Sequence, residues 1–335
     1  MSQRTNTAKQ NQSRKTNARA FEVRVPASTS NLGAGFDCFG LALQLYLTVS
    51  AVVAEDSNLK CNIRFSTGRE NVNLPQTAEN LIYRAMSYAA RREGLTLPKV
   101  DLLIDNEIPI SRGLGSSAAA IVAGIKLCEL LCQCPLSNDK VLHYATEFEG
   151  HADNIAASLL GGFVVTCISR HGEIVVVRKD WPQDIHVVVV APNSPLATRL
   201  ARAALPRHVN HVDAVFNLQR AALFDAALTE HRYDLLWEAM QDRLHQEKRQ
   251  SLVPGLAEAL ATPQMPGLLG LALSGAGPSV LALAEKNFEQ IGESIARCFR
   301  LRRIDTTVRQ LEIDTVGCQS RLLQASSTEA RRAGI

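Results

Sequence analysis

The chain has 335 residues, of which 46% are hydrophobic and 21% are charged, and its formal net charge is +3. This composition is ordinary for a globular protein with a large core, and the length allows two domains. The positive charge comes from residues 1–20, because the remainder holds 31 basic and 33 acidic residues. A nearly neutral body excludes the charge signature of a nucleic-acid-binding protein.

The ends of the chain and its cysteines favour a cytoplasmic protein without membrane contact. Residues 1–20 are polar and have no apolar core segment, so we expect a disordered basic tail rather than a secretory signal. One long uncharged run, residues 265–284, contains two prolines and four glycines, which predicts two strands and a loop rather than a membrane span. None of the eight cysteines forms a Cys-x-x-Cys pair, and we expect reduced thiols.

The first third of the chain predicts strands and a helix around two glycine-containing segments. Residues 21–25 alternate apolar and polar side chains, which indicates a half-buried strand. A polar glycine loop at residues 26–37 and a second strand at 41–53 follow. After a helix at 80–92, a strand at 100–104 leads into the sequence ISRGLGSSAAA, at residues 110–120.

This second glycine segment has the features of an anion site. Gly113 and Gly115 allow the backbone to turn tightly and approach a ligand. Ser116 and Ser117 stand where an N-cap would stand, before an apolar helix that continues to residue 131. A glycine turn that feeds a helix presents free N–H groups and the positive end of the helix dipole to a phosphate.

Two known phosphate loops fit this segment poorly. A P-loop requires Gly-Lys, and the chain contains no such pair. The dinucleotide fingerprint is met by Gly113, Gly115 and Ala118, but it should be followed by a second strand with an acidic end about 20 residues later. Residues 132–139 read as a turn instead. Taken alone, the segment also fits an ordinary glycine turn.

The rest of the chain continues with mixed elements, and we place a domain boundary between residues 181 and 182. Before it we expect a helix at 139–150, an apolar segment at 155–162 and a hairpin of residues 163–168 and 174–177. Beyond it we expect a buried strand at 185–191, helices at 198–205, 212–240 and 288–300, the last capped by Asn287, and a strand at 303–316. Residues 319–335 read as a polar tail.

Three segments in this order resemble the three signatures of the galactokinase, homoserine kinase, mevalonate kinase and phosphomevalonate kinase superfamily. They are PASTSNLGAGFD at residues 26–37, PISRGLGSSAA at 109–119 and LSGAGPS at 273–279. The sequence EGHADN at 149–154 narrows the resemblance to the homoserine kinases. The resemblance covers about residues 21–318, and the combination is far more specific than any single motif.

The resemblance implies an α+β fold of two domains with ATP in the cleft between them. The N-terminal domain, residues 21–181, would resemble a small-ribosomal-subunit protein, and the C-terminal domain, residues 182–318, would be ferredoxin-like. The implied reaction transfers the γ-phosphoryl group of ATP to the side-chain hydroxyl of L-homoserine, a step of threonine synthesis from aspartate. A homodimer is common in this family.

The resemblance also implies which residues bind ATP and Mg²⁺. The ATP phosphates would be wrapped by Pro109, Ile110, Ser111, Arg112, Gly113, Leu114, Gly115, Ser116, Ser117, Ala118 and Ala119. Ser116 or Ser117 would lie near the metal, and a carboxylate on the helix before His151 would hold it. Glu147 and Glu149 are both candidates, with a slight preference for Glu149. Such a loop suits phosphoryl transfer, which depends on positioning and charge neutralisation.

For the acceptor, the residues that match family positions are Asn31, Asp37, His151, Asn154, Thr198, Arg202, Arg249 and Gly275. Asp37 would pair with the ammonium of homoserine, and Arg202 and Arg249 would bind its carboxylate in a bidentate manner. The family usually has Gln-Pro-Tyr-Arg where this chain has Gln-Glu-Lys-Arg, ending at Arg249. This departure puts the aim of Arg249 in question.

Catalysis by Asn154, Asp37, His151 and Arg202 would proceed without a dedicated carboxylate base. Several relatives in the superfamily have an aspartate base where this chain has Asn154, and an amide cannot accept a proton in that role. The resemblance therefore implies alignment of the hydroxyl and stabilisation of the transition state. His151 is the nearby titrating alternative.

Three other functions compete with this one. A dinucleotide oxidoreductase would leave the first and third motifs unexplained. A non-enzymatic sensor is disfavoured by the intact Asp37, Glu149 and Asn154. The nearest rival is a kinase for another small alcohol, such as mevalonate or a different hydroxy amino acid, and Asp37 and the two arginines favour a zwitterion.

Overall fold

The computed structural model describes residues 19–54, 58–66 and 74–323, so the expected basic tail lies almost wholly outside it. Within these ranges the strands form two sheets. The first sheet has seven strands in the order β11-β1-β2-β4-β3, with β5 paired to β2 and β6 paired to β5. The second has four strands in the order β10-β7-β9-β8. The mixture of helices and strands expected from the sequence therefore forms an α+β architecture.

The first sheet is built on a long antiparallel hairpin of β1 (Ala20–Asn31) and β2 (Gly35–Val53). The polar loop expected at residues 26–37 is therefore wrong, because only residues 32–34 lie outside the two strands. Residues 27–32 are all buried, including Ser28, Thr29 and Ser30. Buried hydroxyls interrupt the apolar alternation that marks a strand in the sequence, although here they line a site.

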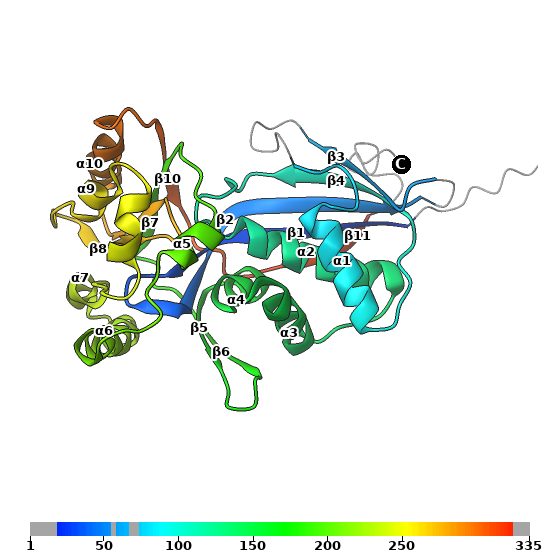
Figure 1. The fold of residues 1–335 in the computed structure, drawn as a ribbon, viewed down its shortest axis with the longest axis horizontal. Coiled ribbons are helices and arrows are strands. Elements are labelled where there is room, and N and C mark those ends of the chain that lie inside the picture. Colours follow the sequence, from blue (N-terminus) through cyan, green and yellow to red (C-terminus); the bar gives the residue numbers. More distant parts are fainter. Residues whose placement is uncertain (1–18, 55–57, 67–73, 324–335) are drawn as a thin grey trace, which may run out of the picture.

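Four helices lie together on one face of the first sheet (Figure 1). They are α1 (Leu81–Arg92), α2 (Ser116–Cys132), α3 (Asn138–Glu149) and α4 (Asp153–Leu160). The helix α2 is apolar on nearly all sides because it packs between α1, α3, α4 and the sheet. At Gly124 a Cβ would lie 2.3 Å from the Ile82 carbonyl oxygen, so the glycine allows α1 and α2 to approach closely.

The remaining strands of this sheet are β3 (Cys61–Phe65), β4 (Val100–Asn106), β5 (Phe163–Ile168) and β6 (Ile174–Lys179). The predicted hairpin is confirmed, since β5 and β6 pair antiparallel. No helix in the described ranges is long and apolar enough to cross a membrane.

The second sheet lies at the opposite end of the molecule from α1 (Figure 1). Its strands are β7 (His186–Pro192), β8 (Leu268–Leu273), β9 (Val280–Ala284) and β10 (Thr306–Leu311). The helices around it are α5 (Thr198–Ala203), α6 (His211–Thr229), α7 (Leu236–Ala239), α8 (Gln246–Arg249), α9 (Leu256–Leu260) and α10 (Phe288–Arg300). The single helix expected at 212–240 is wrong, because α6 ends at Thr229 and His231 takes a left-handed conformation with φ 54°.

The end of the chain returns to the first sheet. Residues 319–323, expected as part of a polar tail, form β11 (Gln319–Leu323), which pairs antiparallel with β1. Four of its five side chains are exposed and only Leu323 is buried, so this edge strand carries almost no apolar signal. The chain thus passes from the first sheet to the second between Lys179 and His186, beside the predicted boundary, and it returns to the first sheet after β10.

Candidate active site

A pocket of about 310 Å³ lies between the first sheet with its helices and the segments α5, α8 and the β8–β9 loop of the second half. Its wall includes residues 109–118 of the glycine segment, but Ala119 is fully buried inside α2. The acceptor residues expected from the sequence all line it, namely Asn31, Asp37, His151, Asn154, Thr198, Arg202, Arg249 and Gly275. The β1–β2 hairpin, the start of α4, α5, α8 and the β8–β9 loop supply them.

The start of α2 differs from the sequence prediction. Its N-cap is Gly115, in the left-handed conformation, and no side chain caps the helix. Ser116 and Ser117 are therefore the first helical residues, and Ser117 is free to bond elsewhere. A Cβ on Gly115 would lie 2.1 Å from the Ser28 hydroxyl oxygen, so close packing against β1 requires glycine here.

Three successive carbonyls of the glycine segment accept hydrogen bonds from the second half of the chain. The carbonyl of Ser111 accepts from the Leu196 amide at 3.0 Å, and that of Arg112 from the Ser279 amide at 3.3 Å. The carbonyl of Gly113 accepts from the Ser274 hydroxyl at 2.7 Å. These bonds fix the orientation of the peptide planes in the loop. They also occupy its carbonyl oxygens, which would repel an anion if they faced it.

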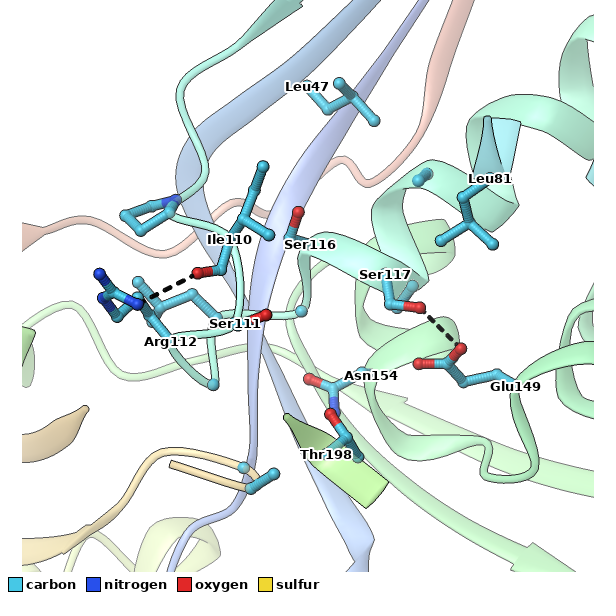
Figure 2. A pocket seen from close by; sticks show the side chains of 18 of the residues that line it. Leu47, Leu81, Ile110, Ser111, Arg112, Ser116, Ser117, Glu149, Asn154 and Thr198 are labelled. Carbon is cyan, nitrogen blue, oxygen red and sulfur yellow. Dashed lines mark hydrogen bonds between the residues drawn. The ribbon is translucent and has the colours of Figure 1, made fainter. Parts of the chain in front are cut away.

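The two glutamates proposed for the metal lie in different surroundings. The Ser117 hydroxyl donates to the Glu149 carboxylate at 2.7 Å, and both line the pocket, as Figure 2 shows. Glu147 is outside the pocket wall and pairs with Arg92 and Tyr88. The pocket therefore contains a hydroxyl and a carboxylate side by side.

Asn154 is held by a buried polar network. Its amide oxygen accepts from the Ser28 hydroxyl at 3.0 Å, and its amide nitrogen donates to the Ser30 hydroxyl at 2.8 Å. Its backbone amide donates to Asp153 at 2.7 Å. These contacts fix the orientation of the Asn154 side chain at the pocket wall.

Asp153 is a residue of the site that the sequence reasoning missed. Its carboxylate, 1% exposed, lies 2.8 Å from Nδ1 of His151. Burial opposes charge on both groups, yet the hydrogen bond and mutual charge outweigh it. They raise the pKa of His151 and lower the pKa of Asp153. Asp153 stands two residues after His151 in the motif EGHADN, and this position was the signal that could have identified it.

Asp37 and Arg202 form a bidentate ion pair across the pocket, with distances of 2.8 and 3.1 Å. Both side chains are 37% exposed. Asn31 closes the hairpin turn behind them, because its side-chain oxygen accepts from the Asp37 amide at 3.1 Å and its nitrogen donates to the Gly275 carbonyl at 2.9 Å. The two groups expected to bind opposite ends of one substrate thus bind each other here.

Arg249 points into the pocket wall despite its unusual neighbours. It is 2% exposed, whereas the side chains of Glu247 and Lys248 are turned to solvent. Its guanidinium donates to the carbonyls of Ala201 and Gly275 at 3.2 and 3.0 Å. Burial, followed by the charge of Arg202, lowers its pKa to about 10. No carboxylate of the described residues pairs with it directly.

One end of the pocket is apolar and was not foreseen. It is lined by Leu47, Phe65, Leu81, Ile104 and Ile110, with the amides of Asn80 and Asn106 nearby. Figure 2 shows Leu47, Leu81 and Ile110 around this end. In the sequence these residues look like ordinary strand and helix core positions, so no signal distinguished them.

Comparison with known proteins identifies the family. Residues 80–162 match the GHMP kinases N terminal domain, and residues 223–301 match GHMP kinases C terminal. A homoserine kinase of Solibacter usitatus is 41% identical over 288 residues, covering 84% of this chain and 90% of the relative. A homoserine kinase of Deinococcus radiodurans is 44% identical over 269 residues, covering 80% and 86%. The chain belongs to the homoserine kinase family.

Solved structures agree with the fold expected for this family. The crystal structure of homoserine kinase from Cytophaga hutchinsonii superposes with a TM-score of 0.79 at 26% identity, over 90% of this chain and 97% of that one. A galactokinase from Lactococcus lactis gives 0.64 at 15% identity, over 91% and 95%. The two-domain kinase fold predicted from the three motifs is confirmed.

Proposed function

We propose that the chain catalyses ATP-dependent phosphorylation of the side-chain hydroxyl of L-homoserine to O-phospho-L-homoserine, in the cytoplasm, as a step of threonine biosynthesis. The observation that carries this proposal is the composition of one pocket. It joins a glycine loop at a helix start, a hydroxyl–carboxylate pair, and an acidic group with two arginines suited to a zwitterion. The homoserine kinases among its relatives support the same substrate.

The nucleotide is assigned to the loop and the apolar end. The phosphates lie at residues 109–118, where the helix start and the constrained loop favour an anion. The base occupies the apolar end beside Leu47 and Phe65, where Asn80 and Asn106 also line the wall. An ATP oriented in this way directs its γ-phosphate toward Asn154 and the acceptor residues, which line the same pocket.

The hydroxyl of Ser117 and the carboxylate of Glu149 fit Mg²⁺. This ion prefers oxygen ligands and is usually bound by one or two carboxylates together with substrate phosphates. Glu149 is therefore assigned to the metal in preference to Glu147, which is engaged with Arg92 outside the pocket. When bound, the ion neutralises charge on the phosphates.

Homoserine is assigned to the groups at the other end of the pocket. Its carboxylate meets Arg249, a buried cation without a carboxylate partner among the described residues, and Arg202. Its ammonium meets Asp37. Since Asp37 and Arg202 pair with each other, a zwitterion can replace that pair and leave neither charge unmatched. An alcohol with one charge would leave the other group without a partner.

Catalysis follows from alignment and charge rather than from a general base. Asn154 is fixed by Ser28 and Ser30 and positions the acceptor hydroxyl. A raised pKa keeps His151 protonated to higher pH, and the lowered pKa of Asp153 makes it a weaker base. The hydroxyl proton accordingly passes to the phosphate oxygens, while Arg202 and the loop stabilise the developing charge.

The test is ADP release over a panel of homoserine, threonine, serine, mevalonate and galactose, with and without Mg²⁺. Homoserine should give the highest kcat/KM, and phosphorus NMR should identify O-phosphohomoserine as the product. A higher kcat/KM for mevalonate or galactose would refute the assignment. The family resemblance also predicts a homodimer, which sedimentation velocity would check.

A further inference from the structure

A fully buried histidine stands behind Arg249. The side chain of His245 has no exposed surface and does not form part of the pocket wall. Its ring stacks on Phe36 with centroids 5.1 Å apart, and Phe36 lies 5.6 Å from the guanidinium of Arg249. His245 thus belongs to the layer that supports the acceptor residues, one step away from any substrate.

The two ring nitrogens of His245 have different partners, and these define its protonation. Nε2 is 2.9 Å from the carbonyl oxygen of Gly33, which can only accept, so Nε2 carries the hydrogen. Nδ1 is 3.3 Å from Nη1 of Arg249, and a guanidinium can only donate, so Nδ1 is the acceptor. Together the two contacts require the neutral, Nε2-protonated imidazole. Burial, the main cause of its lowered pKa, acts in the same direction.

The backbone that carries His245 is itself anchored. The carboxylate of Asp242 accepts hydrogen bonds from the amides of His245 and Gln246 at 2.9 and 2.8 Å, and from the Asn217 side chain at 2.7 Å. These bonds fix the start of α8, and Arg249 follows one turn later on the same helix. The acidic group nearest to the imidazole is therefore already engaged, at 3.7 Å from Nε2.

All described contacts of the Arg249 guanidinium are with neutral acceptors. They are the carbonyls of Ala201 and Gly275 and the imidazole of His245. Neutral acceptors fix the guanidinium plane and, among the described residues, leave it without a directly paired carboxylate. An Asp or Glu at position 245 would hold the same group and cancel the charge that attracts a substrate carboxylate.

We infer that His245 is a positioning residue for substrate binding, a neutral acceptor that orients Arg249 toward the substrate carboxylate without neutralising it. The inference rests on the proposed function, because it takes homoserine as the acceptor. His245 lies outside the pocket wall and thus takes part in recognising the substrate carboxylate through Arg249.

Two amide variants separate the two hydrogen bonds of the ring. In His245→Asn the amide oxygen stands near the place of Nδ1, so it keeps an acceptor for Arg249 and loses the bond to Gly33. In His245→Gln the amide nitrogen stands near the place of Nε2, so it keeps the bond to Gly33 and loses the acceptor. Each variant loses one buried bond, and both should show similar losses of melting temperature. A merely structural role predicts no further difference between them.

The expected result is a split in KM. His245→Gln should raise the homoserine KM about tenfold, the loss expected for one hydrogen bond to a charged group, with the ATP KM unchanged. His245→Asn should stay close to wild type in both constants. His245→Asp keeps the acceptor of His245→Asn but adds a negative charge, and should raise the homoserine KM above that of His245→Asn.

Equal homoserine KM values in His245→Asn and His245→Gln, or equal values in His245→Asn and His245→Asp, would overturn the inference. Nitrogen-15 NMR of histidine-labelled wild-type protein tests it without a substitution. It should show a neutral ring with the hydrogen on Nε2, and a charged ring or the other tautomer would contradict it. A wild type that fails to phosphorylate homoserine would refute the proposed function itself, whereas an active wild type without the KM split refutes the inference alone.

Discussion

Replacing Arg249 with Met tests the assignment of the substrate carboxylate most directly. Methionine fills much of the same volume without charge, and Arg249 is 2% exposed and contacts no carboxylate among the described residues. Removing one partner of a buried charge pair costs about 2–5 kcal/mol. The kcat/KM for homoserine should therefore fall by about 30-fold to several thousand-fold.

The matched replacement of Arg202 should have a smaller effect. Arg202 is 37% exposed and pairs with Asp37, and in the proposed binding mode it exchanges this pair for the homoserine carboxylate. A half-exposed pair of this kind is worth about 0–1 kcal/mol, so Arg202 contributes less net attraction than Arg249. We expect the Arg202→Met variant to lose about tenfold in kcat/KM.

The assay compares homoserine with 3-aminopropan-1-ol, which lacks the carboxylate, at saturating ATP. Arg249→Met should lose most of the wild-type preference for homoserine over the analogue, and the ATP KM serves as the internal control. The variant also leaves the carbonyl of Ala201 without its Arg249 donor, at about 1–3 kcal/mol, and removes one of the two donors to the carbonyl of Gly275, so its melting temperature is measured alongside. An Arg249→Met enzyme that keeps the wild-type preference would refute the reasoning.

Glu149→Gln should raise the Mg²⁺ concentration needed for half-maximal activity by about tenfold or more. Glu147→Gln is the control and should not raise it, because Glu147 lies outside the pocket. A Mg²⁺ titration compares the two variants, and equal shifts would remove Glu149 from the metal site. Asp153→Asn should lower the pKa of His151, followed by imidazole NMR, because the hydrogen bond and charge of Asp153 are what overcome burial there. Since the pKa of His151 is raised above its ordinary value of 6.5, this pair stabilises the fold below that pH, and the contribution is lost as the pH rises through the raised pKa; the variant should not show this dependence in urea unfolding. Ending the chain at residue 318 removes β11 and leaves residues 20–24 of β1 unpaired on that side, so the melting temperature should fall by several degrees, and an unchanged value would contradict a structural role for the strand.

Much of the site could be predicted because its residues are clustered in short motifs. Asn31 and Asp37 stand at the two ends of one hairpin turn, and His151 and Asn154 flank the start of one helix. Their mutual distances are set by local backbone, which the sequence specifies. The pairing of Asp37 with Arg202 could not be predicted, because it joins residues 165 positions apart across the two sheets.

The choice between Glu147 and Glu149 shows what local sequence leaves open. Two residues two positions apart lie on opposite sides of a helix, since each residue turns the chain by about 100°. The sequence could establish that only one of them faces the pocket. Which one does so depends on how α3 packs against α2, and this is a tertiary property. The strand β11 escaped prediction for a related reason, since its position depends on β1 rather than on its own side chains.

The second sheet and its helices are formed by a part of the chain that starts and ends next to the first sheet. The chain leaves after β6 and returns through Ile313, which bridges Leu43, and Asp314, whose amide donates to Ala42. The same part of the chain supplies the donors to the carbonyls of Ser111, Arg112 and Gly113. It also shares a buried core with the first sheet, because Phe224 and Leu281 belong to the same apolar cluster as Phe39. The conformation of the glycine loop therefore depends on both halves of the chain, and neither half alone contains the complete loop with its supporting contacts.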